Sequence, residues 1–475
     1  MHLLYTEEEV IDFRKMLEKI IFSKDIKRLN NKTQLFSSNS GDHYRNRLTH
    51  TLEVVNISKN IAVQIEAFLQ SHFKKILKHK KVLSMELLEA IAYGHDLGHT
   101  PFGHIGERTL QNILKRKDDL GGLIFDSKKI TTNEEILNEW KKNIIKTSFF
   151  KHNVNSLELL IENNIFDWRI LDGVLKHTNI SFTKEENVPV DNLNWLKQKL
   201  SKVNDKKLYD IYFSDRKNFV SNIPLTLEAQ IVAISDEIAQ VYSDLDDTLR
   251  YNKLLKLSKM LNIKGKFSME KTNELVLVEI KEILIKDVIE HFKELILCNH
   301  PNVTNQEELS SIFSFLKINY FVFKKENNEN EEKLKEEYSK LGNSKMDLSI
   351  KSAFYKVCFI NFLKSKYSLK SEKVRMSDAK AKHIIRQLFK AYYNSPDFLN
   401  DKIIEFIKNE YYTLSKTRPK KKFEDIIQEM KNINSQFVTD YNIFIIGNSY
   451  MKAIANYIAK MTDDYALMEY KKIYL

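Results

Sequence analysis

Apolar residues recur every three or four positions along most of this chain, the spacing that gives a helix one buried face. The pattern predicts helices over residues 7–22, from about 45 to 61, over 149–161 and over 225–250. Only eleven glycines and six prolines occur in 475 residues, so few positions interrupt a helix. We therefore expect an all-α protein in which amphipathic helices continue beyond position 250.

The most unusual stretch gathers histidines and acidic residues within a short interval. Its members are His95, Asp96, His99, His104 and Glu107. Imidazole and carboxylate groups bind divalent cations, and they also transfer protons near neutral pH. Glycines and a proline in the same stretch end a helix near Asp96, so we expect the later histidines to lie on a tight loop.

Two interpretations fit the pattern that begins at His95. It is close to the H-E-x-x-H pair of zinc proteases, whose two ligands share a continuous helix. Gly98 and Pro101 disfavour such a helix. In the alternative, His95 and Asp96 form a pair of ligands at a helix end, completed by a His and an Asp from elsewhere.

Two histidines lie at the ends of apolar helical stripes. His50 precedes Val54 and Ile57 at helical spacing, and His95 follows Ile91 in the same way. Two helices that each present an imidazole from a core-facing end can meet at one ion. Arg47 lies on the same face as His50 and within reach of an anionic ligand of that ion.

An acidic residue interrupts the apolar stripe of the helix expected over 225–250. Asp236 occupies a position where the pattern requires an apolar side chain. A buried carboxylate is costly unless it is paired or binds a metal. An exposed acidic face explains Asp246 and Asp247 but not Asp236, so we expect Asp236 to join the two imidazoles.

Composition limits the remaining function classes. The formal net charge of +11 permits a polyanionic partner without identifying one. Two cysteines, Cys298 and Cys358, are too few for a disulfide framework. We find neither a signal-peptide pattern nor an apolar run long enough for a membrane span, so we expect a cytoplasmic protein without membrane contact.

Several motifs together resemble the HD-domain deoxynucleoside triphosphate triphosphohydrolases, the bacterial dGTPase family. The motifs occupy residues 28–29, 32–36, 45–54, 95–107, 150–153, 227–239 and 457–466. The resemblance implies an HD-domain helical core with additional C-terminal helices. It divides the chain into an N-terminal helix and substrate-side loop (1–40), a metal-dependent phosphohydrolase core (41–250) and a C-terminal helical region (251–475).

The resemblance also implies a role for individual residues. The metal ligands it implies are His50, His95, Asp96 and Asp236. The catalytic dyad it implies is His104 with Glu107, in which Glu107 fixes the tautomer of His104. The substrate-binding residues it implies are Gln34, Arg47, His99, His152, Asn153 and Asp244. Gln240 and Ser243 depart from the Tyr and His that such families usually carry.

The activity implied by this resemblance is hydrolysis of deoxynucleoside triphosphates, with dGTP favoured, to deoxynucleoside and tripolyphosphate. It implies one divalent metal per active site (Mn, Mg, Fe, Co or Zn) and a homo-oligomer, a tetramer or hexamer. The alternative is a nucleic-acid-binding regulatory HD protein with weak or no such hydrolysis. The net charge and the basic turn at 418–422 favour single-stranded nucleic acid as its partner.

Overall fold

A computed structural model describes most of the chain. It covers residues 5–34, 45–127, 150–178, 224–251, 261–262, 273–299, 303, 305, 308, 346–347, 372–416 and 421–475. These residues form helices and turns, apart from the two-residue strands β1 (Leu261–Asn262) and β2 (Met346–Asp347), which pair in parallel. The all-α fold expected from the sequence is confirmed.

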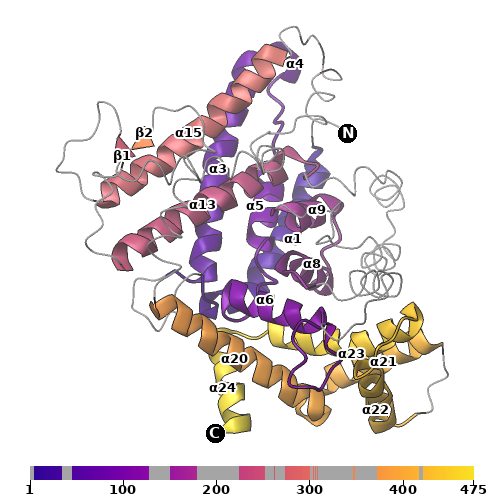
Figure 1. The fold of residues 1–475 in the computed structure, drawn as a ribbon. Coiled ribbons are helices and arrows are strands. Elements are labelled where there is room, and N and C mark those ends of the chain that lie inside the picture. The colour runs from indigo at the N-terminus through magenta and orange to yellow at the C-terminus, as the bar shows by residue number, and fades with distance from the viewer. Residues whose placement is uncertain are drawn as a thin grey trace.

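The helices fall into two groups (Figure 1). The first group is α1 (Glu7–Phe22), α2 (Lys24–Arg28), η1 (Leu29–Asn31), α3 (Arg47–His72), α4 (Lys74–Leu77), α5 (Met85–Gly94), α8 (His152–Glu162), α9 (Trp168–Lys176), α13 (Leu227–Tyr251) and α15 (Asn273–Asn299). The second is α6 (Gly103–Leu114), α20 (Glu372–Asn394), η6 (Pro396–Phe398), α21 (Asp401–Ser415), α22 (Phe423–Asn434), α23 (Tyr441–Ala459) and α24 (Asp463–Tyr474).

Each group has its own apolar core. Val54 of α3, Ile91 of α5 and Val232 of α13 are fully buried in the first core. Leu110 of α6 belongs to the second core, with residues of α20 and α23. Figure 1 accordingly shows α6 between the first group of helices and the C-terminal ones. The segment that joins α5 to α6 therefore lies where the two cores meet.

The chain between α5 and α6 departs from the expected loop. α5 ends at Gly94 with His95 as its C-cap, in agreement with the predicted end near Asp96. Phe102 and Gly103 then take left-handed backbone angles, with φ of 61° and 60°, and α6 begins at Gly103. The expectation that His104 lies on a loop is therefore wrong, because this reversal places it in the first turn of a helix.

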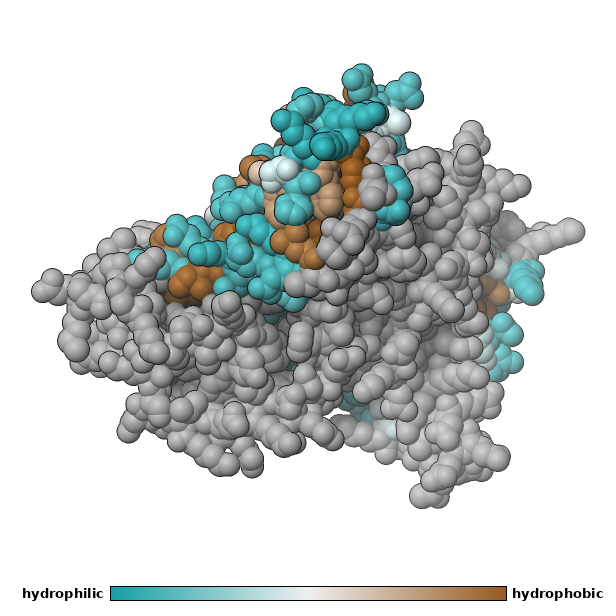
Figure 2. All heavy atoms as spheres, turned by 90° about the horizontal axis from the view of Figure 1, so that it is seen from above, coloured by the Kyte–Doolittle hydropathy of each residue, from teal (hydrophilic) through white to brown (hydrophobic). Residues whose placement is uncertain are grey.

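No helix among the described ranges is both long and apolar enough to cross a lipid bilayer. Figure 2 looks down on the end of the molecule at which α4 lies in Figure 1. Among the coloured residues there, apolar groups alternate with hydrophilic ones. Cys358 and residues 418–420 of the expected basic turn lie outside the described residues, as does the side chain of Cys298.

A buried carboxyl group on α13 gives the fold a pH dependence. Glu228 is 2% exposed and accepts a hydrogen bond of 2.9 Å from the backbone N–H of Ser84, the residue that caps α5. Burial raises the pKa of Glu228 from 4.5 to about 7. Between these values the folded protein keeps a proton that the unfolded chain has released, so the stability of the fold decreases as pH rises.

We expect Glu228→Gln to remove this pH dependence, because the amide keeps the acceptor for Ser84 and does not ionise. From pH 5 to pH 8 the wild type should lose about 2.5 kcal/mol more unfolding free energy than the variant. Urea unfolding at both pH values measures the difference. Equal losses in the two proteins would show that Glu228 titrates normally.

Candidate metal centre and active site

Three helices bring four metal-binding side chains to one place. His50 comes from the first turns of α3, His95 and Asp96 follow α5, and Asp236 lies within α13. Oδ1 of Asp236 is 2.9 Å from Nε2 of His50 and 3.7 Å from Nε2 of His95. The convergence that the interrupted apolar stripes predict is therefore present, and the role of these residues as ligands stays a prediction.

The protonation state of this cluster suits a cation. Nδ1 of His95 lies 2.6 Å from the carbonyl oxygen of Ala92, so it carries the hydrogen and leaves the Nε2 lone pair free. That Nε2 is buried, without a hydrogen-bond partner among the described residues, and lies 3.7 Å from Oδ2 of Asp96. Burial opposes ionisation of Asp236, but the hydrogen bond and charge of His50 still lower its pKa.

The same cluster raises the pKa of His50. Burial works against the charged imidazole, but the hydrogen bond to Asp236 and the charges of Asp236 and Asp96 outweigh it. The buried imidazoles of His50 and His95 and the carboxylate of Asp96, with the half-buried carboxylate of Asp236 against them, provide the donor set of a first-row divalent cation. His50, His95 and Asp96 fit such an ion, and Asp236 is in contact with two of them.

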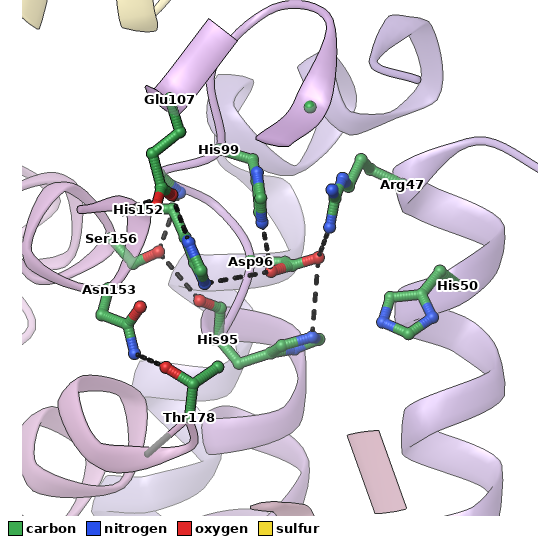
Figure 3. Close-up of polar contacts among 12 residues, drawn as sticks. Arg47, His50, His95, Asp96, His99, Glu107, His152, Asn153, Ser156 and Thr178 are labelled. Carbon is green, nitrogen blue, oxygen red and sulfur yellow. Dashed lines mark hydrogen bonds and ion pairs between the residues drawn. The ribbon is translucent and has the colours of Figure 1, made fainter. Parts of the chain in front are cut away.

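The Asp96 carboxylate faces in two directions (Figure 3). Its Oδ2 accepts a 2.7 Å hydrogen bond from Nη1 of Arg47, on the side of His95. Its Oδ1 lies 3.3 Å from Nε2 of His99 and 4.0 Å from Nε2 of His152. Burial opposes ionisation of Asp96. The surrounding positive groups, mainly His99 and Arg47, nevertheless hold the pKa of Asp96 well below its usual range.

Glu107 pairs with a different histidine from the one expected. Its Oε2 lies 2.6 Å from Nδ1 of His152 and also accepts a 3.1 Å hydrogen bond from the backbone N–H of His152. Burial opposes ionisation of Glu107, yet the charge and hydrogen bonds of His152 keep its pKa well below the usual range. The tautomer that Glu107 fixes is therefore that of His152, and the expected pairing of Glu107 with His104 is corrected.

His104 lies at the open side of the cluster. Its ring centroid is 5.2 Å from that of His99 and 6.3 Å from that of His152. The surrounding protein, then Arg47 and His152, lower the pKa of His104 by disfavouring the imidazolium. The side chain is nevertheless exposed, and water moderates this lowering. In the free protein His104 is thus neutral near pH 7 and accessible from solvent.

Close backbone contact holds the loop that carries His99 against α8. A Cβ on Gly98 would lie 2.1 Å from the backbone nitrogen of Ser156 and 2.3 Å from the carbonyl oxygen of His152, so only glycine fits. The Gly98 N–H donates to Oγ of Ser156 at 2.8 Å, and Asn155 donates to the Gly98 carbonyl at 2.7 Å. These contacts place His152 beside His99, and their rings stack with centroids 4.0 Å apart.

A carboxylate at the start of α24 also fixes the loop before His104. Oδ1 of Asp463 accepts a 2.7 Å hydrogen bond from the backbone N–H of Phe102, which has the left-handed conformation. Oδ2 of Asp463 accepts from the backbone N–H of Thr33 at 3.0 Å and from the Thr33 hydroxyl. Lys32, fully enclosed, donates to the carbonyl oxygens of His99 and, at 3.2 Å, of Ala459. The C-terminal helices therefore help to shape the site.

The remaining expected substrate residues lie in three places. The backbone oxygen of Gln34 and Nη2 of Arg47 lie 3.5 Å and 3.4 Å from where a Cβ on Gly103 would lie, and the buried Oε1 of Gln34 has no partner among the described residues. Nδ2 of Asn153 donates to Leu175 and Thr178, joining α8 to the end of α9. Asp244 is buried two turns beyond Asp236 on α13. Substrate contacts of all three stay predictions.

The acidic residues beyond Asp236 differ from their expected exposure. Asp246 and Asp247 are 4% and 0% exposed, so the interpretation of an exposed acidic face is wrong for them. Nη1 of Arg45 compensates their charge, 2.6 Å from Oδ2 of Asp246 and 3.4 Å from Oδ1 of Asp247. Burial, only partly offset by Arg45, raises the pKa of Asp247 to about 7.

The sequence reasoning missed His177, which lies within the cluster. It is the C-cap of α9, and its Nδ1 lies 2.7 Å from the carbonyl oxygen of Val174, as Nδ1 of His95 lies against Ala92 at the end of α5. Its Nε2 is 3.4 Å from Nε2 of His152. Burial, then the neighbouring His95, lower the pKa of His177 to about 4. His95 and His177 share one sequence feature by which His177 could have been found: each directly follows an apolar helix.

Comparisons with known proteins agree with this geometry. Residues 47–240, which span from Arg47 past Asp236, match the model of the HD domain. The deoxyguanosinetriphosphate triphosphohydrolase-like protein of Rickettsia felis is 26% identical over 97% of this chain and 91% of its own length. The protein of the same name from Caldanaerobacter subterraneus subsp. tengcongensis is 26% identical over 98% of this chain and 85% of its own length.

Proposed function

We propose that this chain, which contains an HD domain and is similar over nearly its whole length to deoxyguanosinetriphosphate triphosphohydrolase-like proteins, hydrolyses deoxynucleoside triphosphates, dGTP preferentially, to deoxynucleoside and tripolyphosphate. The observation that carries the proposal is the buried cluster of His50, His95 and Asp96, with the half-buried Asp236 in contact with both imidazoles and with Nη2 of Arg47 unpartnered beside the cluster among the described residues. We propose a homo-oligomer, tetramer or hexamer, as its assembly.

In this proposal a divalent cation is bound by His50, His95, Asp96 and Asp236. It would supply positive charge against the phosphate oxygens and lower the pKa of water. The donor set of two imidazoles and two carboxylates suits Mn, Fe, Co, Zn or Mg.

The side chains around Asp96 bind and orient the triphosphate. Nη2 of Arg47 is buried and has no partner among the described residues, so it is available to donate to phosphate oxygens. Nε2 of His99 lies 3.3 Å from Oδ1 of Asp96 and carries the hydrogen of the neutral ring, so in this proposal Nδ1 of His99 donates to a phosphate oxygen once the charge of the triphosphate protonates the ring. Nη1 of Arg47 donates to Asp96, and this hydrogen bond fixes the direction of Nη2. Gln34, which like Arg47 approaches Gly103, contacts the deoxyribose or base in this proposal.

His104 is the proposed general acid. Water attacks the α-phosphorus, the bond from phosphorus to the 5′ oxygen breaks, and that oxygen takes a proton from His104 as the deoxynucleoside leaves. The low pKa of free His104 requires that the bound triphosphate raise it, since several negative charges favour the imidazolium. Water supplies the proton that restores His104. Glu107 acts through His152, whose ring it orients.

Product analysis tests the reaction class. Purified protein with Mn²⁺ is incubated with each of the four dNTPs, and phosphorus NMR and chromatography follow the products. We expect one deoxynucleoside and one tripolyphosphate per substrate, with dGTP consumed fastest. Release of pyrophosphate or single phosphates would contradict attack at the α-phosphorus, and no turnover of any dNTP would favour the nucleic-acid-binding alternative.

A further inference from the structure

We propose that a second divalent cation binds between His152, His177 and Asp96, and that the Asp96 carboxylate bridges it to the first. The inference deepens the proposed function and rests on it for the first cation. It changes the number of metal ions expected per chain from one to two. It also gives a role to His177, which the proposed reaction does not use.

The first argument is the direction of two lone pairs. Nδ1 of His177 lies against the carbonyl oxygen of Val174, and Nδ1 of His152 lies against the carboxylate of Glu107. Each acceptor takes the hydrogen of Nδ1, so Nε2 is the nitrogen that each ring can offer to a cation. These two Nε2 atoms face each other at 3.4 Å. Two nitrogens at that distance need a positive charge between them, either a shared proton or a bound cation.

The second argument is the spacing of the three donor groups. Donor atoms of His152, His177 and Asp96 all lie within 4.8 Å of one another. Ligands bound at about 2.0–2.1 Å around a tetrahedral cation are separated by roughly 3.3 Å. The 3.4 Å between the two Nε2 atoms equals that separation, and the 4.0 Å from Nε2 of His152 to Oδ1 of Asp96 needs a small rotation.

The third argument is that the three donor groups are buried and that hydrogen bonds orient the two imidazoles. The exposed fractions of Asp96, His152 and His177 are 3%, 6% and 2%, so their donor atoms are withdrawn from water. The imidazole donors are oriented through their second nitrogens, by the carboxylate of Glu107 and by the carbonyl of Val174. Metal-binding histidines in proteins are oriented by this kind of hydrogen bond. The two sides of Asp96 then serve one cation each, Oδ2 toward His95 and Oδ1 toward His152.

Two cations bridged by a carboxylate typically lie about 3.5–4 Å apart and act together on phosphate oxygens. In the proposed function, His152 would thus contact the triphosphate through a cation that it binds. Cations placed on both sides of Asp96 would offset more of the triphosphate charge than one alone.

Titration with Mn²⁺ alone tests the proposal without any nucleotide. The metal-free protein is titrated with Mn²⁺, bound metal is counted by mass spectrometry, and the EPR spectrum is recorded at saturation. We expect two Mn²⁺ per chain and the multiline spectrum of a spin-coupled pair. One Mn²⁺ per chain with an uncoupled spectrum would overturn the proposal and would indicate a proton shared between His152 and His177. Because no dNTP is present, this outcome is independent of the product analysis.

His177→Gln supplies the matched comparison. The amide keeps a polar side chain of similar size, but it is a much weaker metal ligand than imidazole. We therefore expect one Mn²⁺ per chain and loss of the coupled spectrum. The control is His383→Gln, which alters an exposed histidine that contacts Tyr470 and should leave two Mn²⁺ bound. Two Mn²⁺ in His177→Gln would contradict the assignment. If the variant does not fold, the count and spectrum of the wild type still decide.

Discussion

Replacement of Asp236 by Ala is expected to abolish both bound metal and activity. Oδ1 of Asp236 contacts His50 at 2.9 Å and His95 at 3.7 Å, so the substitution removes the carboxylate that joins the two imidazoles. The two imidazoles and Asp96 would then lack the second carboxylate of the proposed ligand set. Because the proposed cation needs that charge, we expect metal content at the background of the assay and turnover at least a thousandfold lower.

The control for this substitution removes a carboxylate elsewhere. Asp12 lies on α1, is exposed and pairs with Lys15 at the surface, so Asp12→Ala should keep metal and activity. Mass spectrometry of the purified proteins gives the metal content, and circular dichroism shows whether each variant is folded. A folded Asp236→Ala protein with full metal and full activity would refute the site.

Replacement of His104 by Ala is expected to separate binding from turnover. Its ring is exposed and more than 5 Å between centroids from that of His99, and none of the four proposed metal ligands is removed. The leaving 5′ oxygen would lose its proton donor, which corresponds to a decrease of about 10²–10⁴ in kcat. Metal content and the affinity for a non-hydrolysable dNTP analogue should stay close to those of the wild type.

Steady-state kinetics with the His383→Ala control measures this separation. An unchanged kcat for His104→Ala would remove its role as general acid. Should turnover instead be lost in Glu107→Gln and not in His104→Ala, the proton donor would be His152, because Glu107 is hydrogen bonded to that ring.

The cluster of histidines and aspartates could be predicted because it violates a local pattern. An aspartate at an apolar position of α13, and histidines at the ends of two apolar stripes, mark side chains that the core accepts only with partners. The positions of α1, α3 and α13 followed from the same periodicity. The expectation that these polar side chains meet is met by the contacts of Asp236 with His50 and His95, although Asp236 itself is half-buried.

The pairings could not be predicted, because they join residues distant in the chain. Glu107 is one helical turn from His104 in sequence, and only the packing of α8 brings His152 closer. Asp246 and Asp247 look like surface residues until Arg45, about two hundred positions earlier, is placed beside them. His177 follows the apolar helix α9 as His95 follows α5, but a lone histidine there carries little weight by itself.

The central claim is that His50, His95, Asp96 and Asp236 bind one divalent cation. Anomalous diffraction from crystals grown with Mn²⁺ tests it most directly, because the peak locates the ion independently of activity. The account predicts a peak about 2.0–2.3 Å from Nε2 of His95 and from a carboxylate oxygen of Asp236. A saturated crystal with no peak at these four side chains would contradict it.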